Sequence, residues 1–297
     1  MRHGRGLDGR VDLEGIRRVL EQADPHWVGL QEVDGGRRRS GGIHQAAWLG
    51  SALGRPWFFH ATVQWGGPYG LAWFGPPATG TEPGPGARGT VLRVDPQRLP
   101  SRGEPRACLW LQVAAPDGRD EPAWLGVTHL GLSAAERVAQ ARALAERAAR
   151  LRRAGPVVLV GDFNAPADAP ELAPLRQVLT CALAGGRTAP TYPATGGEAG
   201  RPRWVGVEPA AARGAAIDLI WVAGWQVRAR AVLDHAASDH RLVMAILQRP
   251  EPAPAAPAPG PGEARRASPI PSAPGTGTRR GGRPEAQEER SFSRRKI

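Results

Sequence analysis

The stretch "LVGDFNAPAD", Leu159–Asp168, carries the strongest structural signal in this sequence. Its first residues complete the apolar run of residues 157–160, which is typical of a strand buried on both faces of a sheet. The run stops at Gly161, and Asp162 and Asn164 follow at once. Carboxylate and carboxamide groups are costly to desolvate, so at the end of a buried strand they face either water or a ligand.

The segments around this strand alternate between helical and extended patterns. Ser133 and Glu136 form an S-x-x-E capping box ahead of a long helical pattern that Gly155 and Pro156 terminate. Nearer the start, apolar residues recur at helical spacing before "HWVGLQEVD", which has the pattern of a short strand that finishes in acid. This alternation predicts an α/β fold.

Composition divides the chain into two parts. The chain has 297 residues, 41% of them hydrophobic, which is enough for a sizeable core, and we expect one domain over residues 1–249. From residue 250 onward the sequence is rich in Pro, Ala, Gly and Arg and nearly free of large apolar side chains. Such a segment cannot bury enough surface to offset its ordering entropy, so we expect residues 250–297 to form a disordered tail.

Charge and targeting signals limit the class of protein. The formal net charge is +11, and the basic residues are Arg apart from Lys296, so the surface favours an anionic partner. The sequence has no run of about 18 apolar residues, and its start, "MRHGRGLDGR", lacks the hydrophobic part of a secretory signal. We therefore expect no transmembrane segment and a cytoplasmic location, with Cys108 and Cys181 as buried thiols.

Polar side chains of catalytic type lie at the ends of four strand-like segments. Taken singly, each has an ordinary alternative: a solvated carboxylate, a turn residue, or a histidine within the core. Taken together they favour a functional site, because strand ends at one rim of a sheet converge in space. The residues are Glu32, His129, Asp162 with Asn164, and Asp239 with His240.

Five short segments occur in an order and at spacings that resemble the endonuclease/exonuclease/phosphatase superfamily. This superfamily includes deoxyribonucleases, abasic-site endonucleases, neutral sphingomyelinases and inositol-polyphosphate phosphatases. The resemblance extends from about His3 to Gln248 and implies two facing β-sheets flanked by helices, a four-layer β-sandwich of the α/β class. The segments are "LQEV", "THLGL", "GDFNAP", "IDLIWV" and "SDHRLV".

The resemblance also implies a metal ion. Glu32 would hold Mg²⁺, with Mn²⁺ as the alternative ion, because Mg²⁺ prefers hard oxygen ligands and keeps several of its waters. Asp239 would assist the metal directly or through a water. These two carboxylates are the expected metal ligands of the chain.

The remaining site residues take catalytic roles by the same resemblance. Asp162 would orient and deprotonate the attacking water, and Asn164 would hold both the water and the phosphate. His240 would hydrogen-bond a non-bridging oxygen while Asp218 of "IDLI" holds its ring, and His129 would be a second phosphate contact. We expect His240, Asp218 and Asp162 within hydrogen-bonding or one-water reach of a common point, as in-line hydrolysis requires.

The sequence departs from the family pattern at its start. Members of the family carry a first strand that ends in an Asn beside the metal, just ahead of an "HHGRG"-like segment. This sequence begins with "MRHGRG" and has no such strand. We expect either a truncated start or an incomplete site.

Two classes of function fit these observations. The first is a Mg²⁺-dependent phosphoesterase, expected to be a monomer, whose substrate is a nucleic acid, a phospholipid head group or an inositol phosphate. The alternative is a catalytically weakened member that binds nucleic acid or anionic lipid with the same fold and its Arg-rich tail. Base stacking on the 10 Trp is a third idea, although we expect most of these side chains in the core.

Overall fold

A computed structural model describes residues 1–77, 90–115, 121–183, 189–196 and 214–251. The chain divides into two compact units, Met1–Glu251 and Pro252–Ile297. The second unit lies outside the described residues, and with it nearly all of the tail expected from residue 250. Among the described residues, no helix is both long and apolar enough to cross a membrane.

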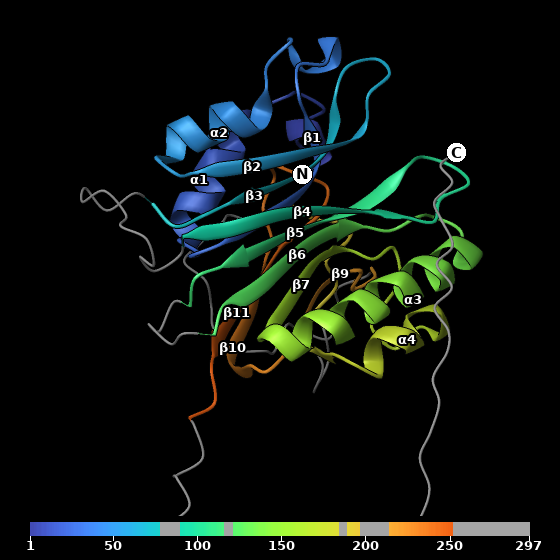
Figure 1. Ribbon diagram of the computed structural model, residues 1–297. Coiled ribbons are helices and arrows are strands. Elements are labelled where there is room, and N and C mark those ends of the chain that lie inside the picture. Colours follow the sequence, from blue (N-terminus) through green and yellow to red (C-terminus); the bar gives the residue numbers. More distant parts are fainter. Residues whose placement is uncertain (78–89, 116–120, 184–188, 197–213, 252–297) are drawn as a thin grey trace, which may run out of the picture. The chain divides into compact units, whose positions relative to one another are not determined.

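The described residues of the first unit form helices and three sheets (Figure 1). The strand order is β1-β3-β2 in one sheet, β10-β11 in another and β4-β5-β6-β7-β9-β8 in the largest. The α-helices are α1 (Leu13–Ala23), α2 (Gln45–Leu53), α3 (Ala134–Leu151) and α4 (Ala173–Arg176). The strands are β1 (Val28–Asp34), β2 (Trp57–Val63), β3 (Tyr69–Phe74), β4 (Val91–Leu99), β5 (Arg106–Val113), β6 (Ala123–His129), β7 (Val157–Asp162), β8 (Thr180–Cys181), β9 (Asp218–Ala223), β10 (Gln226–Leu233) and β11 (Leu242–Gln248). Four 3₁₀ turns are Arg2–Gly4, Arg38–Ser40, Arg152–Ala154 and Pro170–Leu172.

The elements stack in four layers, which confirms the prediction of two sheet layers flanked by helices. Helices α1 and α2 cover the three-stranded sheet through a core that includes Phe74. That sheet packs on the six-stranded sheet through a second core around Val127, and α3 covers the opposite face through a third core around Leu144. The hairpin β10-β11 packs beside β9, so the smaller sheet layer is in two pieces.

The patterns around the quoted stretch form as expected. Ser133 caps α3 by accepting a hydrogen bond from the Glu136 backbone N–H at 3.2 Å. Strand β7 is buried on both faces, with Leu159 in the core beneath α3 and Val158 in the core between the sheets. Cys108 and Cys181 are free and buried, as predicted. Among the Trp side chains, Trp73, Trp110 and Trp221 are fully buried, whereas Trp65 is 73% exposed.

Gly161 is required where β7 passes the end of β6. Its φ is +155°, and a Cβ built on it would lie 2.1 Å from the Thr128 carbonyl oxygen, which belongs to the backbone and cannot turn away. Gly161 and Thr128 are directly paired in the parallel ladder between β6 and β7. A larger residue here would separate two strands that both end at the same rim.

We predict that Gly161→Ala lowers the free energy of unfolding by about 2–3 kcal/mol, because the added methyl group overpacks a backbone contact. Urea denaturation followed by circular dichroism measures this change. Gly103→Ala is the matched control and is expected to be nearly neutral, because the nearest atom to its Cβ would be a Glu136 side-chain oxygen at 4.0 Å. If Gly161→Ala and Gly103→Ala were equally stable, the close approach of Gly161 to the Thr128 carbonyl would not be what requires glycine at this position.

Candidate active site

The register of three adjacent strands places three polar side chains in one row. His129, the last residue of β6, is paired with Asp162, the last residue of β7. Asp162 is in turn paired with Asp218, the first residue of β9. Directly opposed residues of neighbouring strands have their Cβ atoms about 5 Å apart, so these side chains meet without any loop to position them.

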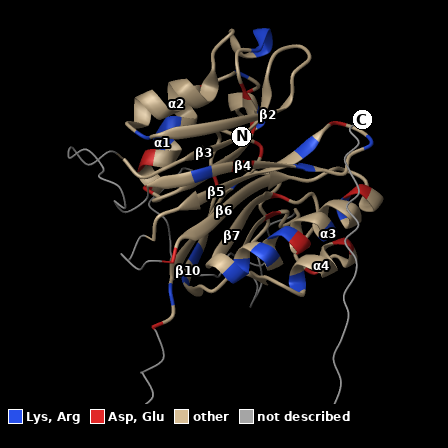
Figure 2. Cartoon of the chain, viewed as in Figure 1, with Lys and Arg blue, Asp and Glu red and all other residues tan. Residues whose placement is uncertain are grey.

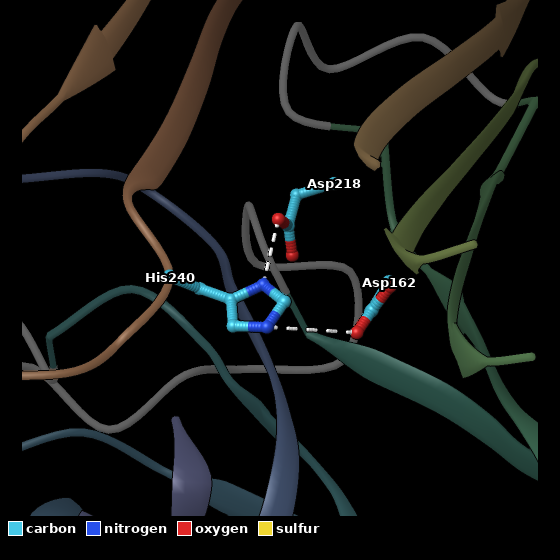
Figure 3. A group of neighbouring side chains, drawn as sticks. All are labelled: Asp162, Asp218 and His240. Atoms are coloured by element: carbon cyan, nitrogen blue, oxygen red, sulfur yellow. Dashed lines mark hydrogen bonds and ion pairs between the residues drawn. The ribbon is translucent and has the colours of Figure 1, made fainter. Parts of the chain in front are cut away.

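His240 joins this row from the segment that precedes β11 (Figure 3). Its Nδ1 lies 2.8 Å from Oδ2 of Asp218, and its Nε2 lies 3.9 Å from Oδ2 of Asp162. The ligand atoms of Asp162, Asp218 and His240 all lie within 4.8 Å of one another. The structure therefore brings this expected trio to a common point.

The two imidazoles of the site have opposite electrostatic environments. Burial lowers the pKa of His129 well below its ordinary value, and the charge of Arg106 lowers it further. Burial also lowers the pKa of His240, but the hydrogen bond and charge of Asp218 outweigh it and raise the pKa overall. His240 is thus suited to carry a positive charge and His129 to remain neutral.

The neutral His129 has a defined tautomer. Its Nδ1 lies 3.1 Å from Nη1 of Arg106, and a guanidinium can only donate, so Nδ1 accepts. The ring proton is therefore on Nε2, which lies 3.4 Å from Oδ2 of Asp162. This N–H can donate to a carboxylate or to a ligand oxygen beside it.

Asp162 also has a strongly perturbed acidity. Burial raises the pKa of its carboxyl to about 7, and the neighbouring charge of Asp218 adds to that effect. The backbone N–H of Asn164 donates to Oδ1 of Asp162 at 2.8 Å, which holds the carboxyl in place. The Asn164 carboxamide itself donates to the Leu130 carbonyl at 2.9 Å, so in this structure the residue orients Asp162.

Phe163, between the two polar residues, anchors the turn. Its side chain is fully buried in the core beneath α3, with its ring centroid 6.2 Å from that of Trp221. Asn164 has a φ of +49°, which costs energy in a residue other than glycine. Burial of the Phe163 side chain offsets the cost of this backbone conformation and keeps Asp162 at the rim.

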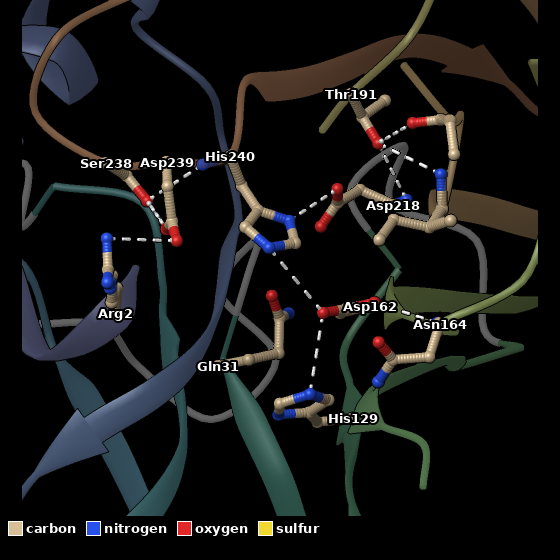
Figure 4. A network of polar contacts seen from close by, with 12 residues as sticks. Arg2, Gln31, His129, Asp162, Asn164, Thr191, Asp218, Ser238, Asp239 and His240 are labelled. Carbon is tan, nitrogen blue, oxygen red and sulfur yellow. Dashed lines mark hydrogen bonds and ion pairs between the residues drawn. The ribbon is translucent and has the colours of Figure 1, made fainter. Parts of the chain in front are cut away.

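Three residues that the sequence analysis did not identify support the site (Figure 4). The buried Thr191 hydroxyl accepts hydrogen bonds from the backbone N–H groups of Ile217 and Asp218, each at 3.0 Å. The Tyr192 ring lies against His240 with its centroid at 4.8 Å. Gln31 of β1, labelled in Figure 4, lines the same cavity as Asp162 and His240. Thr191 and Tyr192 stand in no motif, because each acts through a neighbour distant in sequence, whereas Gln31 belongs to "LQEV" and directly precedes Glu32.

The two expected metal ligands lie near the row but outside its hydrogen-bonded trio. Glu32 lies close enough that its charge contributes to the raised pKa of Asp162. It has a φ of +59° at an irregularity in the pairing of β1 with β3. Asp239 forms an ion pair with Arg2, whose Nη1 lies 3.2 Å from Oδ2. A guanidinium therefore already occupies one oxygen of this carboxylate.

The donor set fits a hard divalent cation. Asp162, Asp218 and Glu32 supply carboxylate oxygens, the ligands that Mg²⁺ and Mn²⁺ prefer. Within the described part of the chain, one group of three or more His, Cys, Asp or Glu side chains has its ligand atoms close enough to hold a metal, and it is Asp162, Asp218 and His240. An acidic centre with a single imidazole differs from the sulfur- and nitrogen-rich sets typical of structural zinc.

A comparison with protein-family models finds the Endonuclease/Exonuclease/phosphatase family over residues 2–240. The chain belongs to this family. Its members are phosphoesterases, and the matched region contains the whole row and His240. No curated protein sequence matches the chain.

Solved structures share the family fold at low sequence identity. A conserved protein of unknown function from Enterococcus faecalis has a TM-score of 0.62 and 20% identity, over 80% of this chain and 91% of that one. A mannosyl-6-phosphatase from Bacteroides thetaiotaomicron has a TM-score of 0.59 and 19% identity, over 80% and 90%. TDP2 from D. rerio, complexed with a single-strand DNA product, has a TM-score of 0.58 and 16% identity, over 80% and 91%. These likenesses establish the fold alone.

We predict that Asp162→Asn stabilises the metal-free protein at neutral pH. The unfolded chain releases the Asp162 proton near pH 4, whereas the folded protein keeps it until about pH 7. Wild-type stability therefore falls relative to the variant as the pH rises from about 4 to about 7, and the difference is constant above that window. Urea denaturation in EDTA at several pH values measures it.

The control for this experiment is Asp168→Asn, which changes an exposed carboxylate of the same loop. It is expected to leave stability unchanged across the same window. A difference between wild type and Asp162→Asn that stays constant from about pH 4 to about pH 8 would show that the Asp162 carboxyl is not perturbed.

Proposed function

We propose that this chain is a Mg²⁺-dependent phosphoesterase that hydrolyses a phosphate ester by in-line attack of a water activated by Asp162. The observation that carries the proposal is the position of this buried carboxyl, whose pKa is raised to about 7, between the Nε2 atoms of His129 and His240. A general base works best when its pKa lies near the operating pH. Mn²⁺ is the alternative ion.

The metal fits the carboxylates of the rim. Glu32 would hold it, with Asp239 beside it. When bound, the ion would neutralise charge on the phosphate oxygens. Asp162 and Asp218 lie close enough to contribute oxygen ligands or to bind metal-coordinated waters.

The other residues stabilise charge and hold positions. His240, whose pKa the hydrogen bond and charge of Asp218 raise against the effect of burial, would donate from Nε2 to a non-bridging oxygen as negative charge develops. His129 would donate from Nε2 as a neutral imidazole, since Arg106 occupies its Nδ1. Asn164 would orient Asp162 through its backbone N–H. Asp162 can then take the proton of a water that faces the phosphorus atom.

The substrate class is a phosphate mono- or diester. Two proteins of this fold are described as a mannosyl-6-phosphatase and as a complex with a single-strand DNA product, which supports both a sugar phosphate type of ester and a nucleic acid as candidates. We propose a nucleic acid, a phospholipid head group or an inositol phosphate as the substrate. Hydrolysis assays over DNA, RNA, phosphoinositide and sphingomyelin with Mg²⁺ distinguish these possibilities.

We predict that Asp162→Asn lowers kcat by about a thousandfold, because it removes the general base, and that His240→Gln lowers it by about a hundredfold or more. Hydrolysis of bis(p-nitrophenyl) phosphate with Mg²⁺ measures both. His60→Gln is the matched control: it makes the same substitution at a half-buried imidazole of β2, outside the site, and is expected to retain wild-type activity. Wild-type activity in the Asp162 variant would contradict the proposal.

We predict that Arg2→Gln tightens Mg²⁺ binding by up to about fivefold. The substitution releases an oxygen of Asp239 from a partly exposed ion pair, and such pairs contribute at most about 1 kcal/mol. Isothermal titration calorimetry with MgCl₂ measures the change. Arg5→Gln is the control, because the Arg5 guanidinium bonds the Gly9 carbonyl instead. Unchanged or weaker Mg²⁺ binding in Arg2→Gln would show that Asp239 is not beside the metal.

The same ion pair favours a second candidate function. If Arg2 keeps Asp239 from the metal, the chain would be a catalytically weakened member that binds nucleic acid or anionic lipid. Figure 2 shows basic and acidic residues interspersed along α3, so the charge of that helix is not purely basic. Cleavage that EDTA abolishes and Mg²⁺ restores identifies the enzyme. Binding to DNA or anionic vesicles without cleavage identifies the alternative.

A further inference from the structure

Two neighbouring segments at one end of the three-stranded sheet carry basic and aromatic side chains. Residues 35–42, "GGRRRSGG", follow β1, and residues 64–68, "QWGGP", join β2 to β3. The Gly35 backbone N–H donates to the Pro68 carbonyl at 2.8 Å, so the two segments lie side by side beyond the strand ends (Figure 1). Trp65 is 73% exposed here. Trp is enriched at binding interfaces, so a ring this exposed is a candidate ligand contact.

Arg37 holds Trp65 in this exposed position. Its Nε donates to the Gly67 carbonyl at 2.9 Å, and its Nη2 donates to the Trp65 carbonyl at 3.3 Å. Its Cζ also lies 5.9 Å from the ring centroid of Trp65 and 4.9 Å from that of Tyr69. Because Tyr69 is buried, these contacts attach the loop to the sheet. The exposed ring is therefore positioned before a ligand arrives, which lowers the entropic cost of binding.

The two arginines that follow have different surroundings. Arg39 donates to both carboxylate oxygens of the buried Asp34, at 2.9 and 2.7 Å. The exposed side chain of Arg38 forms no hydrogen bond or ion pair with any residue that the structure describes. Within the described chain, Asp34 is the one carboxylate at ion-pair distance from the guanidinium groups of Arg37, Arg38 and Arg39. Positive charge therefore remains for an anionic ligand, and Arg38 is free to contact it.

Tyr69 connects this surface to the candidate active site. Its ring packs against Arg37 on one side of the cluster and against Arg39, whose Cζ lies 5.0 Å from the ring centroid. Tyr69 also lines a small pocket together with Glu32 and His129. Burial raises the pKa of Tyr69, and the nearby charge of Glu32 adds to that effect. The basic surface thus begins beside the expected metal ligand and extends outward to the exposed tryptophan.

We propose that Arg37, Arg38, Arg39, Trp65 and Tyr69, here called the Trp65 platform, bind a single-stranded nucleic acid next to the phosphate that is hydrolysed. An unpaired base would stack on the Trp65 ring, and Arg38 would bind a backbone phosphate. Arg37 and Arg39 would position these two contacts. The inference deepens the proposed function, on which its catalytic part rests, by naming single-stranded nucleic acid as the substrate class.

The chemistry of the Trp65 platform favours this ligand over the other substrate classes. An inositol phosphate has no aromatic face that could stack on a tryptophan ring. A bilayer surface binds through several apolar side chains that insert together, whereas residues 35–42 and 64–68 contain one large apolar side chain, that of Trp65. In a duplex each base is already paired and stacked on its neighbours. An unpaired base joined to phosphates fits both the ring and the guanidinium beside it.

The first test measures stacking separately from catalysis. Fluorescence anisotropy in EDTA reports binding of a fluorescein-labelled single-stranded DNA of about ten nucleotides without turnover. Trp65→Leu keeps an apolar side chain but removes the aromatic face, and it is expected to weaken binding at least about fivefold. Trp65→Phe is the matched control, because it keeps an aromatic ring, and it is expected to bind within about twofold of wild type.

The second test measures the phosphate contact. Arg38→Gln is expected to reduce the slope of log K against log salt concentration by about 0.7, the value for one phosphate contact to a single strand. A loss of packing alone would not change this slope. Arg142→Gln is the control, because it removes an exposed guanidinium from α3, and it is expected to leave the slope unchanged.

Several results would overturn the proposal. They are equal binding by Trp65→Leu and Trp65→Phe, an unchanged salt slope in Arg38→Gln, and tighter binding of the wild type to duplex DNA or phosphatidylserine vesicles than to the single strand. Hydrolysis of bis(p-nitrophenyl) phosphate by the wild type with Mg²⁺ tests the activity separately, because this small ester has no nucleic acid chain to reach the Trp65 platform. Absence of that hydrolysis, with oligonucleotide binding that depends on Trp65, would contradict the proposed function and still support binding by the platform.

Discussion

The site depends on two carboxylates that face each other across neighbouring strands. Asp162 and Asp218 are directly paired in the ladder between β7 and β9 and are both largely buried. Burial weakens their hydration and their like charges repel, so the Asp162 carboxyl retains its proton to about pH 7 unless a cation is present. His240, bonded to Asp218 and facing Asp162, partly compensates this charge. A divalent cation would compensate the remaining negative charge of the two carboxylates.

The backbone of the large sheet maintains this arrangement. Helix α3 crosses over from β6 to β7, so the two strands are parallel and His129 and Asp162 end at one rim. Gly161 allows the close approach of the two strands, and buried Phe163 fixes the turn that follows. The positions of the polar groups are thus determined by strand pairing and core packing. Among these polar groups, His240 is the one whose position depends mainly on the conformation of a loop.

Part of this arrangement could be predicted from the sequence. The apolar run of β7, the capping box of α3 and the polar strand ends are local signals, and the structure has these elements where they were expected. Strand β4 was not identified, since its residues are mostly exposed and include Pro96, so that it follows no apolar pattern. Its extended conformation comes from pairing with β5.

The supporting residues of the site could not be predicted for a related reason. Thr191 bonds the start of β9 from a distant loop, and Arg106 sets the tautomer of His129 from the start of β5. The ion pair of Asp239 with Arg2 joins the two ends of the matched region. Such contacts depend on how the layers stack, so no local pattern in the sequence predicts them. The polar residues themselves were recognisable because each follows or begins a strand.

The most direct test of this charge balance is a ¹⁵N NMR titration of the histidine side chains in the metal-free protein. His240 is expected to keep its second ring proton to a higher pH than a free imidazole. His129 is expected to stay neutral, with its proton on Nε2, well below the pH at which a free imidazole titrates. If both rings titrate together near the ordinary value of about 6.5, the carboxylate pair does not control the site and the account is contradicted.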